Sequence, residues 1–287
     1  MSPLLYQENA IMMMTTQHGK AFRAPAEFLS MRNVDIARGQ KVVLRDVNLT
    51  IATGEHIAIL GPNGCGKSTL IKAMTCECYP IVRHGMEMKV YGRDRWEVQE
   101  LRKHLGVVAA ELPGERTAVT RGLDAVVSGF FSSSTLWPNL EVTESMRVGA
   151  MDALALLGAD HLRDRWVGEM SAGEKRRVMI ARALVHRPEM LLLDEPSNAL
   201  DLAAQRELRE ILRDVAAGSG DHRGTGVVMV THHLADILPE IDRVVMMRGG
   251  RIVADGSKME LLQAARLEEL FGVELEVTER HGYWHSW

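Results

Sequence analysis

One glycine-rich stretch limits the possible folds of this chain more than any other feature. Residues 61–69 read GPNGCGKST, which matches the phosphate-binding pattern G-x-x-x-x-G-K-[ST]. An apolar run at residues 56–60 comes directly before it and predicts a buried strand. Glycines let the backbone curl so that several N–H groups point at phosphate oxygens, and a helix that begins near Gly66 adds the positive end of its dipole. The segment therefore predicts a strand, a loop and a helix that together bind a nucleoside triphosphate.

The residues expected to surround the phosphates are contiguous. They are Gly61, Pro62, Asn63, Gly64, Cys65, Gly66, Lys67, Ser68 and Thr69. A loop of this kind without a ligand is disfavoured, because Lys67 would point inward with no phosphate to neutralise it. Cys65 is interpreted as a small filler residue, although its alkylation would block the loop.

The composition is that of an ordinary globular protein. Hydrophobic residues are 46% of the 287-residue chain, charged residues are 25%, and the net charge of −4 offers no attraction for nucleic acid. No apolar run approaches the ~20 residues that a bilayer requires, so we expect no direct membrane insertion. Three cysteines are too few for a disulfide framework and indicate a reducing cytoplasm. Cys76 and Cys78 lack a second pair at metal-binding spacing and are interpreted as ordinary thiols.

The hydrophobic pattern alternates strands with helices. Residues 29–34 and 41–50 alternate apolar and polar positions on either side of a turn, which predicts an antiparallel hairpin. Four later segments alternate between helix and strand: 172–186, 190–194, 202–217 and 226–231. Such alternation predicts an α/β fold with a mostly parallel sheet. Helical spacing at 120–128 and 143–157 interrupts the order and predicts an inserted helical lobe.

Two carboxylates at the end of an apolar strand give a second chemical signal. Residues 190–196 read MLLLDEP. This order places Asp194 where it can hold Mg²⁺ and Glu195 where it can reach a water that attacks a γ-phosphate. An Asp-Glu pair, rather than a lone Asp, is typical of an ATP hydrolase that carries its own general base.

A helix start precedes that strand. Residues 170–177 read MSAGEKRR, with Ser171 as an N-cap and Glu174 three residues later, as in a capping box. With the phosphate loop and the Asp-Glu strand, this segment resembles the ATP-binding subunits of ABC-type systems, whose signature reads roughly L-S-G-G-Q at this place. The resemblance runs from about Phe28 to Ala254 and implies an ABC-type P-loop core with a mostly parallel sheet, an antiparallel β subdomain and an inserted helical subdomain.

The resemblance also implies residue roles. Ser171, Gly173 and Glu174 would meet the ATP bound to a second subunit, and Asp201 would end a loop, the D-loop, that joins the two subunits. His232 would hydrogen-bond the γ-phosphate. The expected catalytic residues are Glu195, His232 and Lys67. Because one chain holds one complete set of motifs, we expect a homodimer that binds ATP and Mg²⁺.

Two positions depart from the family pattern. Arg38 stands where the family has an aromatic residue that stacks on adenine, and we expect either stacking by its guanidinium plane or an ordinary solvated turn arginine. After residues 105–108 the family has a glutamine that touches Mg²⁺, whereas this chain reads Ala109-Ala110-Glu111. Glu111 lies one position late and becomes a candidate metal ligand beside Ser68 and Asp194.

We expect three parts: an N-terminal extension at residues 1–26, an ATP-binding domain at 27–258 with its helical insert at about 112–168, and a tail at 259–287 that forms helix and then strand. Residues 125–137 resemble the matching region of subunits that serve iron-chelate and cobalamin uptake, and of ATPases grouped with molybdate uptake. Phe130, Phe131 and Trp137 there form either a docking patch or internal packing.

The resemblance implies an ATP-binding and ATP-hydrolysing subunit that powers a separate membrane permease. Such a subunit would be cytoplasmic and would sit at the inner face of the membrane through that permease. A soluble ABC ATPase without a permease, such as an assembly scaffold or a regulatory factor, is the alternative. The missing glutamine adds weight to this alternative, because in the family it senses the membrane partner, but transport remains the leading hypothesis.

Overall fold

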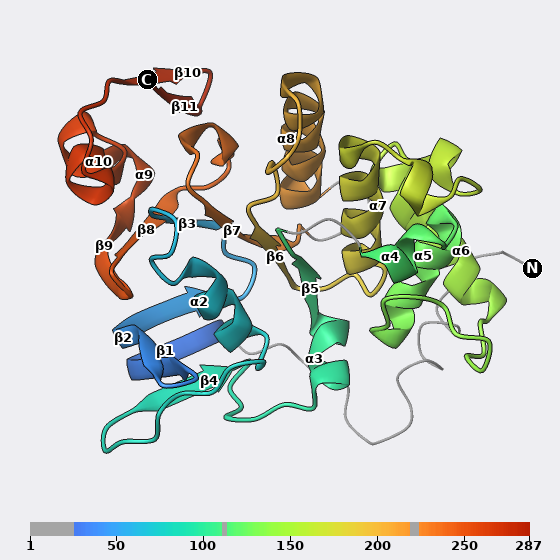
Figure 1. The fold of residues 1–287 in the computed structure, drawn as a ribbon, viewed down its shortest axis with the longest axis horizontal. Helices are drawn as coiled ribbons and strands as arrows, with labels where there is room; N and C mark the ends of the chain where they lie inside the picture. Colours follow the sequence, from blue (N-terminus) through green and yellow to red (C-terminus); the bar gives the residue numbers. More distant parts are fainter. Residues whose placement is uncertain (1–25, 111–113, 219–223) are drawn as a thin grey trace, which may run out of the picture.

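A six-stranded sheet forms the centre of the molecule (Figure 1). The computed structural model describes residues 26–110, 114–218 and 224–287, so the expected extension lies almost wholly outside the described residues. The strands in spatial order are β5 (Leu105–Val108), β6 (Met190–Asp194), β7 (Gly226–Thr231), β3 (Ile57–Leu60), β8 (Arg243–Arg248) and β9 (Arg251–Ser257). All neighbours are parallel except β8 and β9, which form an antiparallel hairpin. The prediction of a mostly parallel sheet is confirmed.

A second, antiparallel sheet covers one face of this centre. Its order is β2 (Lys41–Ala52), β1 (Glu27–Arg38) and β4 (Glu87–Val90), with Gly39 at φ +61° in the predicted hairpin turn. Side chains alternate along β3, so that Ile57 and Ile59 join the core under this sheet while Ala58 and Leu60 join the core on the opposite face. The central sheet is therefore buried on both faces, which explains the uninterrupted apolar runs in its strands.

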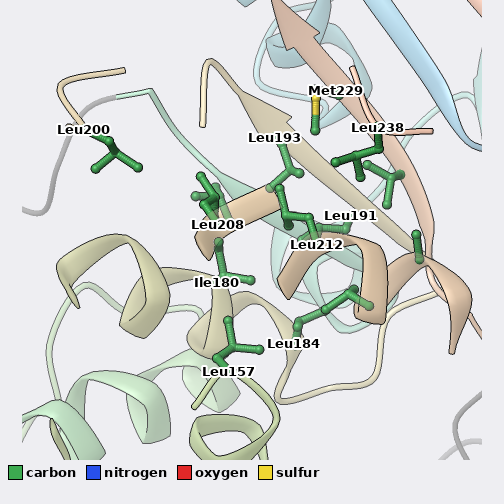
Figure 2. Packing of buried hydrophobic residues seen from close by; sticks show 14 of the residues in the cluster. Leu157, Ile180, Leu184, Leu191, Leu193, Leu200, Leu208, Leu212, Met229 and Leu238 are labelled. Atoms are coloured by element: carbon green, nitrogen blue, oxygen red, sulfur yellow. The ribbon is translucent and has the colours of Figure 1, made fainter. Parts of the chain in front are cut away.

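Helices cover the other face of the central sheet. Figure 2 shows Ile180 and Leu184 of α7 (Ala172–Leu184) and Leu208 and Leu212 of α8 (Leu202–Ala217) around Leu191 of β6. On the face that the antiparallel sheet covers, α2 (Lys67–Met74) packs beneath β2. Helix α3 (Val98–His104) leads into β5.

The helical lobe lies beside α7 (Figure 1). Its helices are α4 (Glu115–Ala118), α5 (Gly122–Val127), the 3₁₀ turn η1 (Ser128–Phe131) and α6 (Glu144–Leu156). Gly158 has φ +58° just after the last of these helices, a conformation that commonly ends a helix. Two further 3₁₀ turns, η2 (Asp160–Leu162) and η3 (Val167–Glu169), lead back to α7. Among the described residues, no helix combines the length and the apolar character that crossing a bilayer demands.

The C-terminal tail is more structured than the predicted helix and strand. It contains α9 (Lys258–Leu261), α10 (Ala264–Phe271) and an antiparallel hairpin of β10 (Val277–Arg280) and β11 (Tyr283–Ser286). Strand β11 contacts the 3₁₀ turn η4 (Leu234–Asp236), which follows β7. Trp284 of β11 is 5% exposed and belongs to the larger core. The tail therefore covers one edge of the core.

Candidate active site

The phosphate loop joins β3 to α2, and its glycines are required by its shape. Gly64 and Gly66 have φ values of +76° and +112°, which side-chain-bearing residues rarely adopt. A Cβ atom on Gly66 would lie 2.6 Å from Cδ2 of Leu44, and a Cβ on Gly61 would collide with the Met247 carbonyl oxygen. The neighbouring strands thus leave room only for bare backbone, which allows the loop N–H groups to approach an anion closely.

Lys67 is a buried cation at the start of α2. Its side chain is 4% exposed, and Nζ donates to the Gly61 and Pro62 carbonyl oxygens at 2.7 and 3.2 Å. The same Nζ lies 3.6 Å from Oε1 of Glu195. The charge is therefore held by loop carbonyls and one carboxylate, at the place where a triphosphate would supply negative charge.

Glu195 and His232 meet because β6 and β7 are neighbouring parallel strands. Asp194 pairs with Val230, so the residues that follow each strand emerge at the same edge of the sheet. Nδ1 of His232 lies 3.1 Å from Oε1 of Glu195. Glu195 has φ +46°, a left-handed conformation that costs energy in a non-glycine residue, and its N–H donates to the Val230 carbonyl at 2.8 Å. Such strain is common where a side chain is held for chemistry.

Asp194 and Ser68 are suited to hold a hard cation. Asp194 is 9% exposed, and its Oδ1 has no hydrogen-bond partner among the residues that the structure describes. Burial raises the pKa of the Asp194 carboxyl, while a hydrogen bond from the Ser68 hydroxyl acts in the opposite direction. A carboxylate oxygen and a hydroxyl are ligands that Mg²⁺ accepts.

The residues that the structure describes contain no group of three or more His, Cys, Asp or Glu side chains fit for a metal ion. Water and phosphate oxygens would therefore complete the coordination, as is usual for Mg²⁺. Glu111, the third expected ligand, lies outside the described residues.

Ser171 caps α7 as the sequence predicts. Its Oγ accepts from the Glu174 N–H at 3.2 Å, and Oε2 of Glu174 accepts from the Ser171 N–H at 2.7 Å, which completes the capping box. These hydrogen bonds, chiefly that from the Ser171 N–H, hold the pKa of Glu174 below its usual value, and Arg165 adds an ion pair at 2.7 Å. Ser171 itself is exposed. A Cβ on Gly173 would lie 2.9 Å from Cβ of Ala204, so α7 and α8 approach closely there.

The remaining expected residues lie around this centre. Oδ1 of Asp201 caps α8 by accepting from the Ala204 N–H at 2.8 Å. Arg38 is exposed at the end of β1, so both of its expected roles remain predictions. Cys65 is 4% exposed, and burial raises the pKa of its thiol, which agrees with the interpretation as a filler. Cys76 and Cys78 are free thiols.

Sequence reasoning missed Arg176. Its side chain is almost fully buried, and its two terminal nitrogens donate to the carbonyls of Ala109 and Ala110 at 2.6 and 2.9 Å. Burial lowers the pKa of this guanidinium, and the Asp194 carboxylate opposes that shift. Arg176 thereby joins the capped helix to the end of β5. Its spacing of four residues from the buried Ile180 is the signal that would have found it.

A groove separates β5 and α7 from the helical lobe. Its volume is about 580 Å³, and its walls include Val107 of β5, Met179 and Arg182 of α7, and Thr117 and Ser134 of the lobe. Phe130 and Phe131 are partly buried against the core, with the Phe130 ring 5.1 Å from that of His186, while Trp137 remains 49% exposed. The aromatic trio is thus divided between internal packing and surface.

Comparison with known proteins places these features in a family. The family model described as "ABC transporter" matches residues 44–198. The hemin import ATP-binding protein of Aliivibrio fischeri is 32% identical over 253 residues, which cover 85% of this chain and 90% of that protein. The sulfate/thiosulfate import ATP-binding protein of Bordetella pertussis is 31% identical over 262 residues, which cover 89% of this chain and 69% of that protein.

Solved structures of ABC transporter cassettes are also similar to this chain. One is cbiO1 from Clostridium perfringens, part of an ABC transporter complex, with a TM-score of 0.70 and 26% identity over 85% of this chain and 94% of that one. Another is an ATP-binding cassette of an ABC transporter in its ADP conformation, with a TM-score of 0.73 and 25% identity over 86% of this chain and 98% of that one.

Proposed function

The chain belongs to the ABC transporter family as an ATP-binding and ATP-hydrolysing subunit, and we propose that it works as a Mg²⁺-dependent homodimer with each ATP held between two copies. In this arrangement the phosphate loop of one copy faces the Ser171-capped helix of the other. The hydrolytic part of the proposal rests chiefly on the shared contact of Glu195 Oε1 with Lys67 Nζ and His232 Nδ1, at 3.6 and 3.1 Å. One complete catalytic centre and one exposed capped helix per chain support a pairwise assembly.

The reaction that these residues support is in-line attack of water on the γ-phosphorus of ATP, with ADP as the leaving group. Glu195 would orient the water and accept its proton on the carboxylate, and His232 would fix the carboxylate through the Nδ1 contact. Lys67 and the loop N–H groups would stabilise the negative charge that develops on the phosphoryl oxygens.

Mg²⁺ is proposed as a further requirement, with Ser68 and Asp194 as its protein ligands. Oδ1 of Asp194, which has no hydrogen-bond partner among the described residues, supports this assignment. The ion would neutralise charge on the β- and γ-phosphate oxygens. Chelation of Mg²⁺ should therefore abolish hydrolysis.

Sedimentation of the Glu195→Gln variant tests the dimer. Slow hydrolysis should trap the closed state, so the variant should sediment as a dimer in saturating Mg²⁺ and ATP and as a monomer without nucleotide. Adding Lys67→Ala to this variant removes a phosphate contact and serves as the control. A monomer at every nucleotide concentration would overturn the proposal.

A membrane permease is the proposed partner, and the groove beside the lobe is its proposed contact. The groove is concave, lies between two structural units, and carries Arg182, whose guanidinium donates to Ser128 Oγ and the Ser133 carbonyl at 3.3 and 2.7 Å. An exposed segment of a polytopic protein would fit there and bring this chain to the inner face of the membrane. The relatives' names specify import, which supports uptake as the direction.

Co-purification from solubilised membranes tests this contact. Ser134→Arg places a bulky cation in the groove and should reduce recovery of a polytopic partner, whereas Ser145→Arg, at an exposed position of α6 outside the groove, should not. Equal recovery of the polytopic partner with both variants would show that the partner does not bind in the groove. Recovery of no membrane protein with the wild type would favour the alternative of a soluble ABC ATPase.

A further inference from the structure

Asp236 is a buried carboxylate that accepts two hydroxyl donors on one oxygen. It ends η4, is 4% exposed, and its Oδ2 receives hydrogen bonds from Ser197 Oγ at 2.7 Å and from Thr231 Oγ1 at 2.6 Å. These lengths are typical of hydroxyl groups that donate to an ionised carboxylate, and such bonds are about twice as strong as neutral ones. The three side chains therefore form a short, strong polar link inside the core.

The two donors come from the two segments that carry the catalytic groups. Ser197 lies two residues after Glu195, at the start of the D-loop (residues 197–201) that leads into α8. Thr231 ends β7, directly before His232, and its Oγ1 also accepts from the His233 N–H at 3.0 Å. The peptide after His232 is therefore fixed by the same hydroxyl that binds Asp236.

These contacts close a ring around the hydrolysis centre. Glu195 leads through the backbone to Ser197, Ser197 bonds Asp236, and Asp236 bonds Thr231. His232 follows Thr231 and returns to Glu195 through the 3.1 Å contact. A displacement of the D-loop would thus change the position of His232 through Asp236.

The C-terminal hairpin packs against the turn that carries Asp236. Strand β11 contacts η4, and Trp284 is buried there. Gly282 lies so close to Pro239 that a Cβ on it would come within 2.9 Å of the proline Cβ. A buried carboxylate that loses its donors is costly, so the covered ring favours one arrangement of the two segments.

We propose that Asp236 is a positioning residue that couples the D-loop to the orientation of His232. The inference deepens the proposed function, because Asp236 acts on the same hydrolysis centre without touching the nucleotide. Asp236 would hold His232 against Glu195 only while Ser197 keeps its place, so a shift of the D-loop against a neighbouring subunit would change the orientation of His232.

Steady-state kinetics of single-hydroxyl variants test the proposal. Ser197→Ala and Thr231→Val each remove one donor, and each should lower kcat about tenfold, the loss expected for a hydrogen bond to a charged group. KM for ATP should stay within about twofold, because the phosphate loop is untouched. Thr231→Ser keeps the hydroxyl and should restore kcat. Thr120→Val removes a buried hydroxyl that bonds the Arg116 carbonyl in the helical lobe and is the matched control.

A double-mutant cycle separates positioning from simple loss of stability. Ser197→Ala added to Asp236→Asn should lower kcat little further, since both changes break one link. If the two changes lower kcat by factors that multiply in the double variant, the proposal is overturned. An unchanged kcat in both single-hydroxyl variants would also overturn it. If Asp236→Asn fails to fold, the cycle is run between Ser197→Ala and Thr231→Val. If the Lys67→Ala variant hydrolyses ATP as fast as the wild type, that result would contradict the proposed function and not the role of Asp236.

Discussion

Nδ1 of His232 lies 3.1 Å from Oε1 of Glu195, although 37 positions separate the two residues in the chain. They meet because each follows one of two adjacent parallel strands, β6 and β7. Lys67 reaches the same oxygen from the first residue of α2, which follows β3, the next strand in the sheet. Parallel strands bring their carboxyl ends to one edge, which is where α/β folds bind ligands. The proposed hydrolysis centre is thus a consequence of strand order.

Replacement of Glu195 should separate binding from turnover. Glu195→Gln keeps the size of the side chain but removes the proton acceptor, so kcat should fall by about 100-fold or more while nucleotide affinity changes little. Phosphate release and a titration with a fluorescent nucleotide measure the two quantities. A parallel loss of both would show that Glu195 mainly supports the shape of the site.

Replacement of Lys67 should act on binding. Lys67→Ala removes the buried ammonium that lies 3.6 Å from Glu195. The phosphates then lose a positive partner and face an unpaired carboxylate, so nucleotide affinity should fall at least tenfold. Calorimetric titration with ATP measures the change. Lys103→Ala alters an exposed lysine of α3 and should bind ATP as the wild type does. Unchanged affinity in Lys67→Ala would refute the role of the phosphate loop.

The two tryptophans of the tail should contribute very differently to stability. Trp284 is 5% exposed and packs in the larger core, whereas Trp287 is 66% exposed. Trp284→Ala should lower the free energy of unfolding by about 3–5 kcal/mol, and Trp287→Ala by less than about 1 kcal/mol. Urea denaturation measures both, and equal losses would contradict the buried position of β11.

Protonation of His186 should destabilise the fold. Burial lowers the pKa of His186 below its ordinary value of 6.5, with backbone hydrogen bonds opposing the shift. Above that value both states are neutral, but as the pH falls below it the unfolded chain binds a proton that the folded chain rejects, so stability decreases. The denaturation midpoint should therefore drop between about pH 7.5 and about pH 5.5.

His186→Gln should reduce this drop, and His285→Gln, at an exposed position, should leave it unchanged. The pKa of His56 is also lowered by burial, so part of the drop should persist in both variants. An identical pH dependence in His186→Gln and the wild type would show that His186 does not contribute.

Local patterns predicted most of the fold. Apolar runs and alternation gave the central strands and the β1–β2 hairpin, and the capping box placed the start of α7 at Ala172. The phosphate loop, Asp194 and Glu195 were predicted because their chemistry is contiguous in the chain. Contacts between distant segments were not predictable in this way. Arg176 binds carbonyls 66 and 67 positions away, and Asp236 bonds a serine 39 positions away.

Other expectations depend on features beyond a single chain. Ser171, Gly173, Glu174 and Asp201 make contacts within their own chain that account for helix capping and packing, and their expected role toward a second subunit is a property of the dimer. The domain boundaries, with the insert at about 112–168, also remain predictions, since α7 packs continuously against both the lobe and β5.

Mixing two inactive variants tests the composite site most directly. Lys67→Ala damages the phosphate loop and Ser171→Arg damages the capped helix, so each homodimer should lack hydrolysis. A mixed dimer would contain one site with both parts intact, and the mixture should hydrolyse ATP well above the sum of the separate proteins. A mixture no more active than that sum would contradict a site shared between two chains.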